Sequence, residues 1–164
     1  MKNVLIVRYG EVALKGSNKS YFENKLIKHI KNNLYDLDRI DIRKSNGLIF
    51  IDIGNNGFQN VIERVIKVFG IVSVSPAYEL DVNMEQIYKA AVIQIKQKLQ
   101  NENFETFKVE SRRGDKSFHL KSPEISRKVG GHILSEFAEL KVDVHNPDVF
   151  LYVDIRDKAY AYSE

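Results

Sequence analysis

The order of strand-like and helix-like patterns in the first 80 residues most constrains how this chain can fold. Four apolar runs have the length and residue types of strands, at residues 3–9, 39–45, 48–53 and 71–80. Two segments between them repeat apolar residues at helical spacing, at residues 20–34 and 58–69. Asn46-Gly47 is a strong signal for a type I′ hairpin. The resulting order, β-α-β-β-α-β, predicts a ferredoxin-like domain over residues 1–77.

A second α/β unit is predicted over residues 78–164. Helices are expected at 84–101, capped by Asn83, and from Ser122 to about Leu140, with Pro123 at the first helical position where its missing N–H costs nothing. Strands are expected at residues 105–111, 148–156 and 159–163. Pro76 interrupts the strand-like run 71–80, which predicts that this strand lies at an edge or leaves the first unit there. The expected fold class is therefore α/β (α+β).

Composition excludes several classes of function. The chain has no cysteine, so disulfides, thiolate nucleophiles and cysteine-based zinc sites are ruled out. Its four histidines fall in different predicted elements without metal-binding spacing, and we predict neither a metal site nor a catalytic residue. No apolar run approaches 18 residues, so we expect no membrane partner and a cytoplasmic protein. Residues 10–17, GEVALKGS, fail the Walker A pattern because Lys15 precedes Gly16.

Positive charge is concentrated in residues 108–128. This basic block holds seven Lys/Arg against three Asp/Glu, whereas residues 129–164 hold three against seven. It spans the start of the helix predicted from Ser122, and a helix N-terminus offers unpaired N–H groups to anions. The block is therefore a candidate phosphate-binding surface, with a solvated polar loop as the alternative.

Two further features need an explanation. Gly130-Gly131 lies inside a predicted helix, where each glycine costs about 1 kcal/mol relative to alanine, so close packing against the sheet or a ligand should offset the cost. Four aromatic residues could stack on nucleic-acid bases: Phe118, Tyr152, Tyr160 and Tyr162. More often, such residues are half-buried aromatic side chains of strands. We expect Tyr152 in the core and leave Phe118 open.

Three segments resemble the tRNA 4-thiouridine synthetases, also called tRNA sulfurtransferases or thiamine-biosynthesis proteins. They are RYGEVALKGSNKSYFENKL (8–26), SRRGDKSFHLKSPEISRKVGGHIL (111–134) and HNPDVFLYVDIRDKAYAYSE (145–164). The resemblance covers essentially the whole chain in register. It implies an amino-terminal ferredoxin-like domain followed by an RNA-binding THUMP domain, in agreement with the element order above.

The resemblance also implies that catalysis and RNA binding reside in different domains. In that family a PP-loop domain binds ATP and adenylates the target uridine, and catalytic cysteines carry the sulfur. We expect this PP-loop domain to be absent from the chain and supplied in cis or in trans, so that the chain alone has no cofactor and no sulfurtransferase activity. The ferredoxin-like and THUMP domains would bind the acceptor stem and 3′-CCA end of tRNA. The tRNA would extend across both copies of a homodimer.

The candidate RNA-binding residues are basic or polar side chains of the first two of these segments. They are Arg112, Arg113, Lys116, Lys121, Arg127, Lys128, Arg8, Lys15 and Asn18. The alternative function is a ferredoxin-like small-molecule-binding or dimerisation module with no RNA role, in which the uneven charge is incidental.

Overall fold

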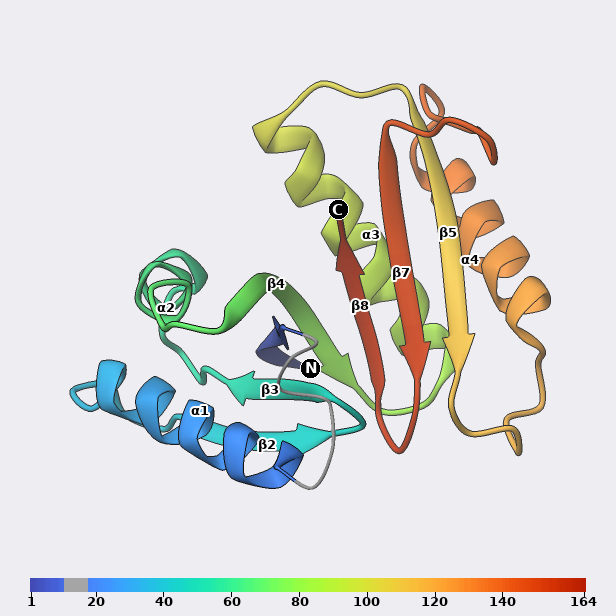
Figure 1. Ribbon diagram of the computed structural model, residues 1–164. Helices are drawn as coiled ribbons and strands as arrows, with labels where there is room; N and C mark the ends of the chain where they lie inside the picture. Colours follow the sequence, from blue (N-terminus) through green and yellow to red (C-terminus); the bar gives the residue numbers. More distant parts are fainter. Residues whose placement is uncertain (11–17) are drawn as a thin grey trace. The chain divides into compact units, whose positions relative to one another are not determined.

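The computed structural model describes residues 1–10 and 18–164 (Figure 1). These residues separate into two compact units, Lys2–Pro76 and Ala77–Glu164. We call them the N-terminal and the C-terminal unit and describe each by itself. Within the described part of the chain, no helix is both long and apolar enough to cross a bilayer.

The N-terminal unit has the predicted βαββαβ order. Its elements are β1 (Lys2–Tyr9), α1 (Lys19–Asn33), β2 (Asp41–Ser45), β3 (Leu48–Asp52), α2 (Phe58–Val65) and β4 (Ile71–Leu80). The strands lie in the order β2-β3-β1-β4, with β3 antiparallel to both of its neighbours. The predicted hairpin is confirmed, because Asn46 and Gly47 both have positive φ, as a type I′ turn requires.

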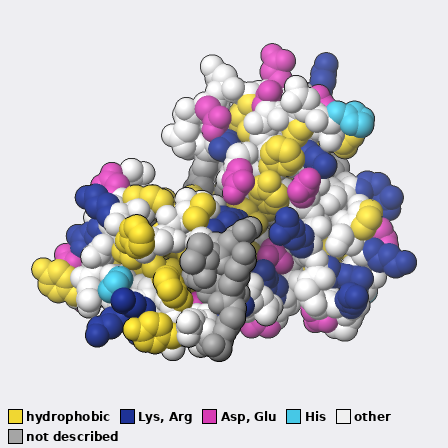
Figure 2. Space-filling view, viewed as in Figure 1, with side chains coloured by type: hydrophobic (Ala, Val, Ile, Leu, Met, Phe, Trp, Pro, Cys, Tyr) yellow, Lys and Arg dark blue, Asp and Glu magenta, His cyan; other side chains and the backbone are white. Residues whose placement is uncertain are grey.

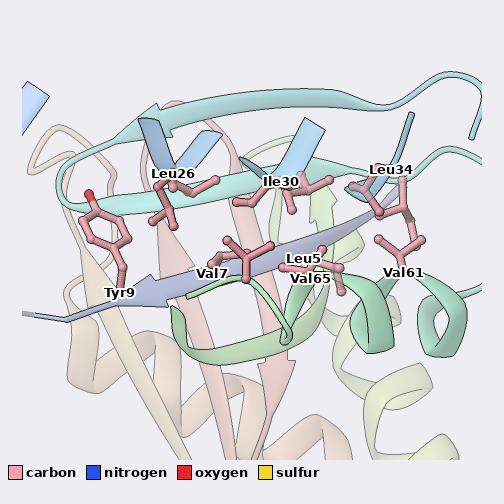
Figure 3. Close-up of a cluster of buried hydrophobic side chains, with 12 residues drawn as sticks. Leu5, Val7, Tyr9, Leu26, Ile30, Leu34, Val61 and Val65 are labelled. Atoms are coloured by element: carbon pink, nitrogen blue, oxygen red, sulfur yellow. The ribbon is translucent and has the colours of Figure 1, made fainter. Parts of the chain in front are cut away.

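One face of β1 and β3 packs against α1 and α2 to form the core of this unit (Figure 3). Leu5 and Val7 of β1 lie among Ile30 and Leu34 from the α1 segment and Val65 of α2 (Figure 3). The helical spacing of the α1 residues produces this contact, because residues three or four apart share one face of a helix.

The course of two elements, α2 and β4, differs from the sequence-based prediction. Helix α2 ends at Val65 and not at Phe69, whose side chain is 95% exposed and so contributes nothing to a buried helical face. Strand β4 runs through Pro76 without interruption. Because Pro76 is the last residue of the N-terminal unit, the proline stands where the strand passes from one unit to the other, as the prediction of an exit from the first unit required.

The C-terminal unit contains the end of β4 and six further elements. These are α3 (Met84–Asn101), β5 (Thr106–Arg113), α4 (Ser122–Glu136), β6 (Lys141–Val142), β7 (Val149–Ile155) and β8 (Ala159–Ser163). The strands lie in the order β4-β8-β7-β5-β6, with β5 parallel to β7 and β6. The short strand β6 was not predicted, because two exposed residues carry no periodicity.

Helices α3 and α4 cover the same face of this sheet (Figure 1). Alternate residues of β7 therefore differ in burial: Val149, Leu151 and Val153 are buried on the helix side, whereas Phe150 and Tyr152 are only partly buried on the other. The predicted cap of α3 is confirmed, since the Asn83 side chain accepts hydrogen bonds from the backbone N–H groups of Glu85 and Gln86.

Candidate nucleic-acid interface

A groove of about 690 Å³ lies between α4 and the edge of β5, in the C-terminal unit. We call it the α4–β5 groove. Its lining comes from β5, from one side of α4 and from the segment around β6: Lys108, Val109, Glu110, Ser111, Arg112, Ser122, Pro123, Ser126, Arg127, Gly130, Gly131, Leu134, Val142 and Val144. The groove therefore contains part of the basic block.

The strand pairing explains why this edge is accessible. Strand β6 pairs only with Thr106 and Phe107, so no strand of the described chain pairs with the outer edge of β5 from Lys108 to Arg113. Helix α4 buries Ile125, Val129 and Ile133 while a second set of its residues borders the groove. An edge strand with unpaired backbone groups beside a helix makes a ready binding surface.

Ser122, Ser126 and Gly130 recur every four residues and so line one side of α4. Ser126 donates a hydrogen bond of 2.8 Å from its hydroxyl to the Ser111 hydroxyl, which links α4 to β5 across the groove. A Cβ added to Gly130 would lie 3.9 Å from Val109 Cγ2, an ordinary contact, and one on Gly131 would meet nothing within 4 Å. Close packing therefore explains Gly130 in part and does not explain Gly131.

The groove lining contains both charged and apolar side chains. Lys108, Arg112 and Arg127 contribute cations, and Lys108 pairs with Glu110 at 3.1 Å. Neither arginine forms a salt bridge within residues 1–10 and 18–164. Leu134 and Val144 contribute partly exposed apolar side chains. The groove can thus hold a ligand with both anionic and apolar groups.

The start of α4 differs in detail from the prediction. The cap position is Lys121, whose side chain makes no capping hydrogen bond, and Pro123 is the second residue of the helix and not the first. Glu124 lies in the first turn, where a carboxylate interacts favourably with the helix dipole. The helix ends at Glu136 and not near Leu140. The attraction of this region for anions therefore comes from side-chain cations as well as from the unpaired N–H groups at the start of α4.

Arg113 has a structural partner and lies outside the groove. Its Nη1 donates hydrogen bonds to the carbonyl oxygens of Phe118 at 3.0 Å and Leu120 at 3.2 Å. In the same loop, Asp115 accepts hydrogen bonds from the Ser117 hydroxyl and backbone N–H, which lower the pKa of the Asp115 carboxyl. Arg113 thus fixes the loop that joins β5 to α4.

The remaining candidates are distributed more widely. Lys116, Lys121 and Lys128 are exposed in the C-terminal unit but do not line the groove. In the N-terminal unit, Arg8 donates from Nη1 to the Ser75 hydroxyl at 3.0 Å, and Asn18 stands at the N-cap of α1 without a side-chain capping bond. Lys15 lies outside the described residues. Of the nine candidates, the structure brings Arg112 and Arg127 together.

Sequence reasoning singled out Gly130-Gly131 but did not predict the other uncharged residues of the groove lining. The four-residue spacing of Ser122, Ser126 and Gly130 was a usable signal for one helix side. Val142, in the two-residue strand β6, and Val144, which follows it, gave no signal, because two exposed valines form no pattern. The prediction that Tyr152 belongs to the core was wrong: it is only partly buried, on the sheet face opposite the helices, while Tyr160 and Tyr162 are buried. Within the described ranges, no group of three metal-binding side chains occurs.

Comparison with known proteins matches both units. Residues 4–75 match the model of the ThiI ferredoxin-like domain, and residues 81–163 match that of the THUMP domain. The chain is 47% identical to a protein of Alkaliphilus metalliredigens named "Probable tRNA sulfurtransferase", and 46% identical to one of the same name from Acetivibrio thermocellus. Each alignment covers the whole chain but 42% of the relative, so the chain spans about two fifths of the length of these relatives.

Two solved structures share the fold along the chain. A 4-thiouridine synthetase crystallised with RNA and ATP superposes with a TM-score of 0.85 at 31% identity, over 100% of this chain and 41% of that one. A Pyrococcus horikoshii protein gives 0.84 at 34% identity, over 99% and 54%. The predicted resemblance and fold class are confirmed, and the chain belongs to the THUMP domain family, with a ThiI-type ferredoxin-like domain preceding the THUMP domain.

Proposed function

We propose that this chain is a tRNA-binding module that recognises the acceptor stem and 3′-CCA end and positions tRNA for 4-thiouridine formation. Its similarity to tRNA sulfurtransferases and to a 4-thiouridine synthetase crystallised with RNA supports this assignment. The observation that carries it is the α4–β5 groove, in which Arg112 and Arg127 lie beside apolar surface and the exposed Gly131.

Each part of the groove suits a different part of a single-stranded RNA end. Guanidinium groups bind phosphate oxygens in bidentate fashion, and both arginines lack a carboxylate partner among the described residues. A glycine without neighbours on its Cβ side lets a sugar–phosphate backbone approach the helix. Proteins recognise RNA mostly through unpaired ends and loops, because the deep major groove of A-form RNA is inaccessible to side chains.

Under this proposal the reaction occurs outside the chain. A PP-loop domain, in cis or in trans, binds ATP and carries out sulfur transfer, and two copies of the protein cooperate on one tRNA. The proposal is consistent with a sequence that contains no cysteine to carry sulfur. The ferredoxin-like and THUMP domains bind and orient the RNA.

The test is fluorescence anisotropy of a labelled tRNA acceptor minihelix, with an intact or trimmed CCA end, at two salt concentrations. We expect tight binding that requires the CCA end and weakens with salt, because phosphate contacts release counterions. Arg112→Ala and Arg127→Ala should each weaken binding by about tenfold, as expected for loss of one charge-assisted contact. Lys89→Ala is the matched control, since Lys89 is exposed on α3 and does not line the groove.

Equal affinity for an unrelated duplex RNA, or an equal effect of Lys89→Ala, would contradict acceptor-end recognition. The alternative, a small-molecule or dimerisation module, predicts a thermal shift with a metabolite, or a change of mass in light scattering, and no response to RNA. Detectable thiolation of tRNA by this chain alone would contradict the assignment of sulfur transfer to a separate PP-loop domain.

A further inference from the structure

The C-terminal sheet has one face that α3 and α4 leave uncovered. Strand register places Lys108, Glu110 and Arg112 of β5 beside Phe150, Tyr152 and Asp154 of β7, in that order, and Tyr152 beside Tyr162 of β8. Side chains alternate along a strand, and the helix-side neighbours are buried. We call these seven residues the open sheet face. Figure 2, in the view of Figure 1, shows hydrophobic side chains over β7 and β8 with charged ones beside them.

Three aromatic rings form a row on this face. The rings of Tyr152 and Tyr162 are stacked with centroids 5.0 Å apart and planes at 19°, and those of Phe150 and Tyr152 are stacked at 5.9 Å and 14°. Tyr162 is buried, while Phe150 and Tyr152 are partly exposed. The row ends at Phe150, which stacks on no further ring of the described chain. Another flat aromatic group could extend the row there.

The charges around the row are mixed, with a cation at Arg112 near one end and a carboxylate at Glu164, whose backbone pairs with Phe150, near the other. Lys108 neutralises Glu110 at 3.1 Å, and Arg156 neutralises Asp154 at 3.2 Å. Arg112 has no carboxylate partner among the described residues, so its charge is available. Its guanidinium lies close enough to Tyr152 to oppose the rise in the pKa of that phenol, which burial and then the carboxylates of Glu164 and Glu110 produce.

Arg112 also connects the two surfaces. It lines the α4–β5 groove, yet by strand register it belongs to the open sheet face. An RNA strand held in the groove would therefore pass Arg112 on its way across the edge of β5. The register partner of Arg112 is Asp154, four residues from Phe150, a distance of about 13 Å along a strand. A phosphate at Arg112 and a base on Phe150 would then belong to different nucleotides.

We propose that the open sheet face binds an unpaired RNA base, stacked on the partly exposed ring of Phe150, while a phosphate of a neighbouring nucleotide contacts Arg112. This inference rests on the proposed RNA-binding function and adds a second binding surface to the groove. Stacking tolerates any base, because every base has a π-face. Cross-strand pairing stabilises sheets and accounts for the Tyr152–Tyr162 pair. It does not account for a third, partly exposed ring in the same orientation.

The test combines two variants with a fluorescent base. Phe150→Leu keeps apolar bulk but removes the ring, and Phe150→Tyr keeps the ring. The probe is the acceptor minihelix with 2-aminopurine at each unpaired 3′ position in turn, because stacking quenches its fluorescence. For the wild-type chain we expect quenching at one position. Phe150→Leu should abolish that quenching and weaken binding about tenfold. Phe150→Tyr should retain both.

The outcomes separate this inference from the proposed function. Salt-sensitive binding that depends on Arg127, with no quenching at any position and no effect of Phe150→Leu, would overturn the stacking site alone. Absence of minihelix binding by the wild-type chain would overturn both proposals. If Phe150→Leu leaves RNA affinity unchanged but converts a dimer to a monomer in sedimentation, the face binds a second copy and the proposal is wrong.

A measurement without variants covers the case in which Phe150→Leu fails to fold. The wild-type chain is irradiated with a minihelix carrying 5-bromouridine at single 3′ positions, and crosslinked peptides are identified by mass spectrometry. Crosslinks to residues 149–155 support the stacking site. Crosslinks confined to α4 and the loop 114–121 overturn it.

Discussion

The arginines of the two domains differ in what their donors contact. In the ferredoxin-like domain, Arg8 donates to the hydroxyl of Ser75 and is partly buried, so it connects β1 to β4. In the THUMP domain, Arg112 and Arg127 border a groove and pair with no carboxylate of the described chain. A basic residue in a sequence is therefore a candidate RNA contact only when its own domain does not already occupy its donors.

The same contrast recurs between neighbours within the THUMP domain. Arg112 and Arg113 are adjacent in sequence, but successive side chains of a strand point to opposite sides. Arg112 reaches the groove, whereas Arg113 binds the carbonyl oxygens of the loop that follows. The following variants test this separation between structural and ligand-facing residues, from the largest expected effect to the smallest.

Paired core deletions give the largest effect and separate the two domains. Ile30 and Ile133 are both fully buried, one in each domain. Ile30→Ala and Ile133→Ala should each lower the free energy of unfolding by about 2–5 kcal/mol, measured by urea denaturation, through lost burial and a residual cavity. Near the unfolding midpoint, minihelix affinity should fall more for Ile133→Ala than for Ile30→Ala. The reverse order would place the main RNA contacts in the ferredoxin-like domain.

Arg113→Ala should destabilise the protein more than Arg112→Ala does. Removing Arg113 leaves two loop carbonyl oxygens without their charged donor, a loss of about 1.5–3 kcal/mol in unfolding free energy. Arg112→Ala should change stability by no more than about 0.5 kcal/mol, as is usual for exposed surface residues. In anisotropy measurements at low temperature, Arg112→Ala should weaken minihelix binding more than Arg113→Ala does. Equal stabilities for the two variants would remove the distinction between these neighbours.

Tyr9→Phe tests a buried polar contact in the ferredoxin-like domain. The Tyr9 hydroxyl donates a hydrogen bond to the buried Glu23 carboxylate. Its loss should cost about 1–2 kcal/mol in chemical denaturation, because the carboxylate keeps its burial but loses a donor. RNA affinity should not change at a temperature where both proteins are folded. A loss of affinity without a loss of stability would assign Tyr9 a role in binding.

The same residue predicts a dependence of stability on pH. Burial, and then the hydrogen bond and charge of Glu23, raise the pKa of Tyr9 above its ordinary value. The folded state therefore retains a proton that the unfolded state loses above about pH 10. This contribution is complete below pH 10 and is lost as the pH rises through the folded-state pKa. Urea denaturation between pH 8 and 11 should show a smaller decline for Tyr9→Phe than for the wild type.

Gly131→Ala should change stability in the opposite direction. No atom lies within 4 Å of a Cβ at this position, so alanine should stabilise α4 by up to about 1 kcal/mol through helix propensity. If an RNA backbone approaches here, minihelix affinity should fall while the melting temperature rises. Gly130→Ala is the comparison within the groove lining, because its Cβ would face Val109 of the sheet. Unchanged affinity for both variants would mean that RNA does not contact this turn of α4.

Local patterns predicted most of the fold because they report local energetics. The apolar spacing of α1 and α3, the Asn46-Gly47 turn and the Asn83 cap each depend on residues within a few positions of one another. The end of α2 and the strand β6 were missed or misplaced. The extent of α2 depends on which side chains find a buried partner, and β6 exists only because it pairs with Thr106 and Phe107.

The sequence by itself determined two α/β units in this order, an excess of positive charge before α4, and no thiol chemistry. Only the tertiary structure decided that β6 stops after two pairs, which leaves the edge of β5 open beside α4. It also decided that Arg112 borders that edge while Arg113 binds its own loop, and that three aromatic rings share one face. The open edge of β5 depends on pairing between segments distant in sequence, and the Arg113 contacts depend on the path of the loop that follows it, so helical or strand periodicity encodes neither.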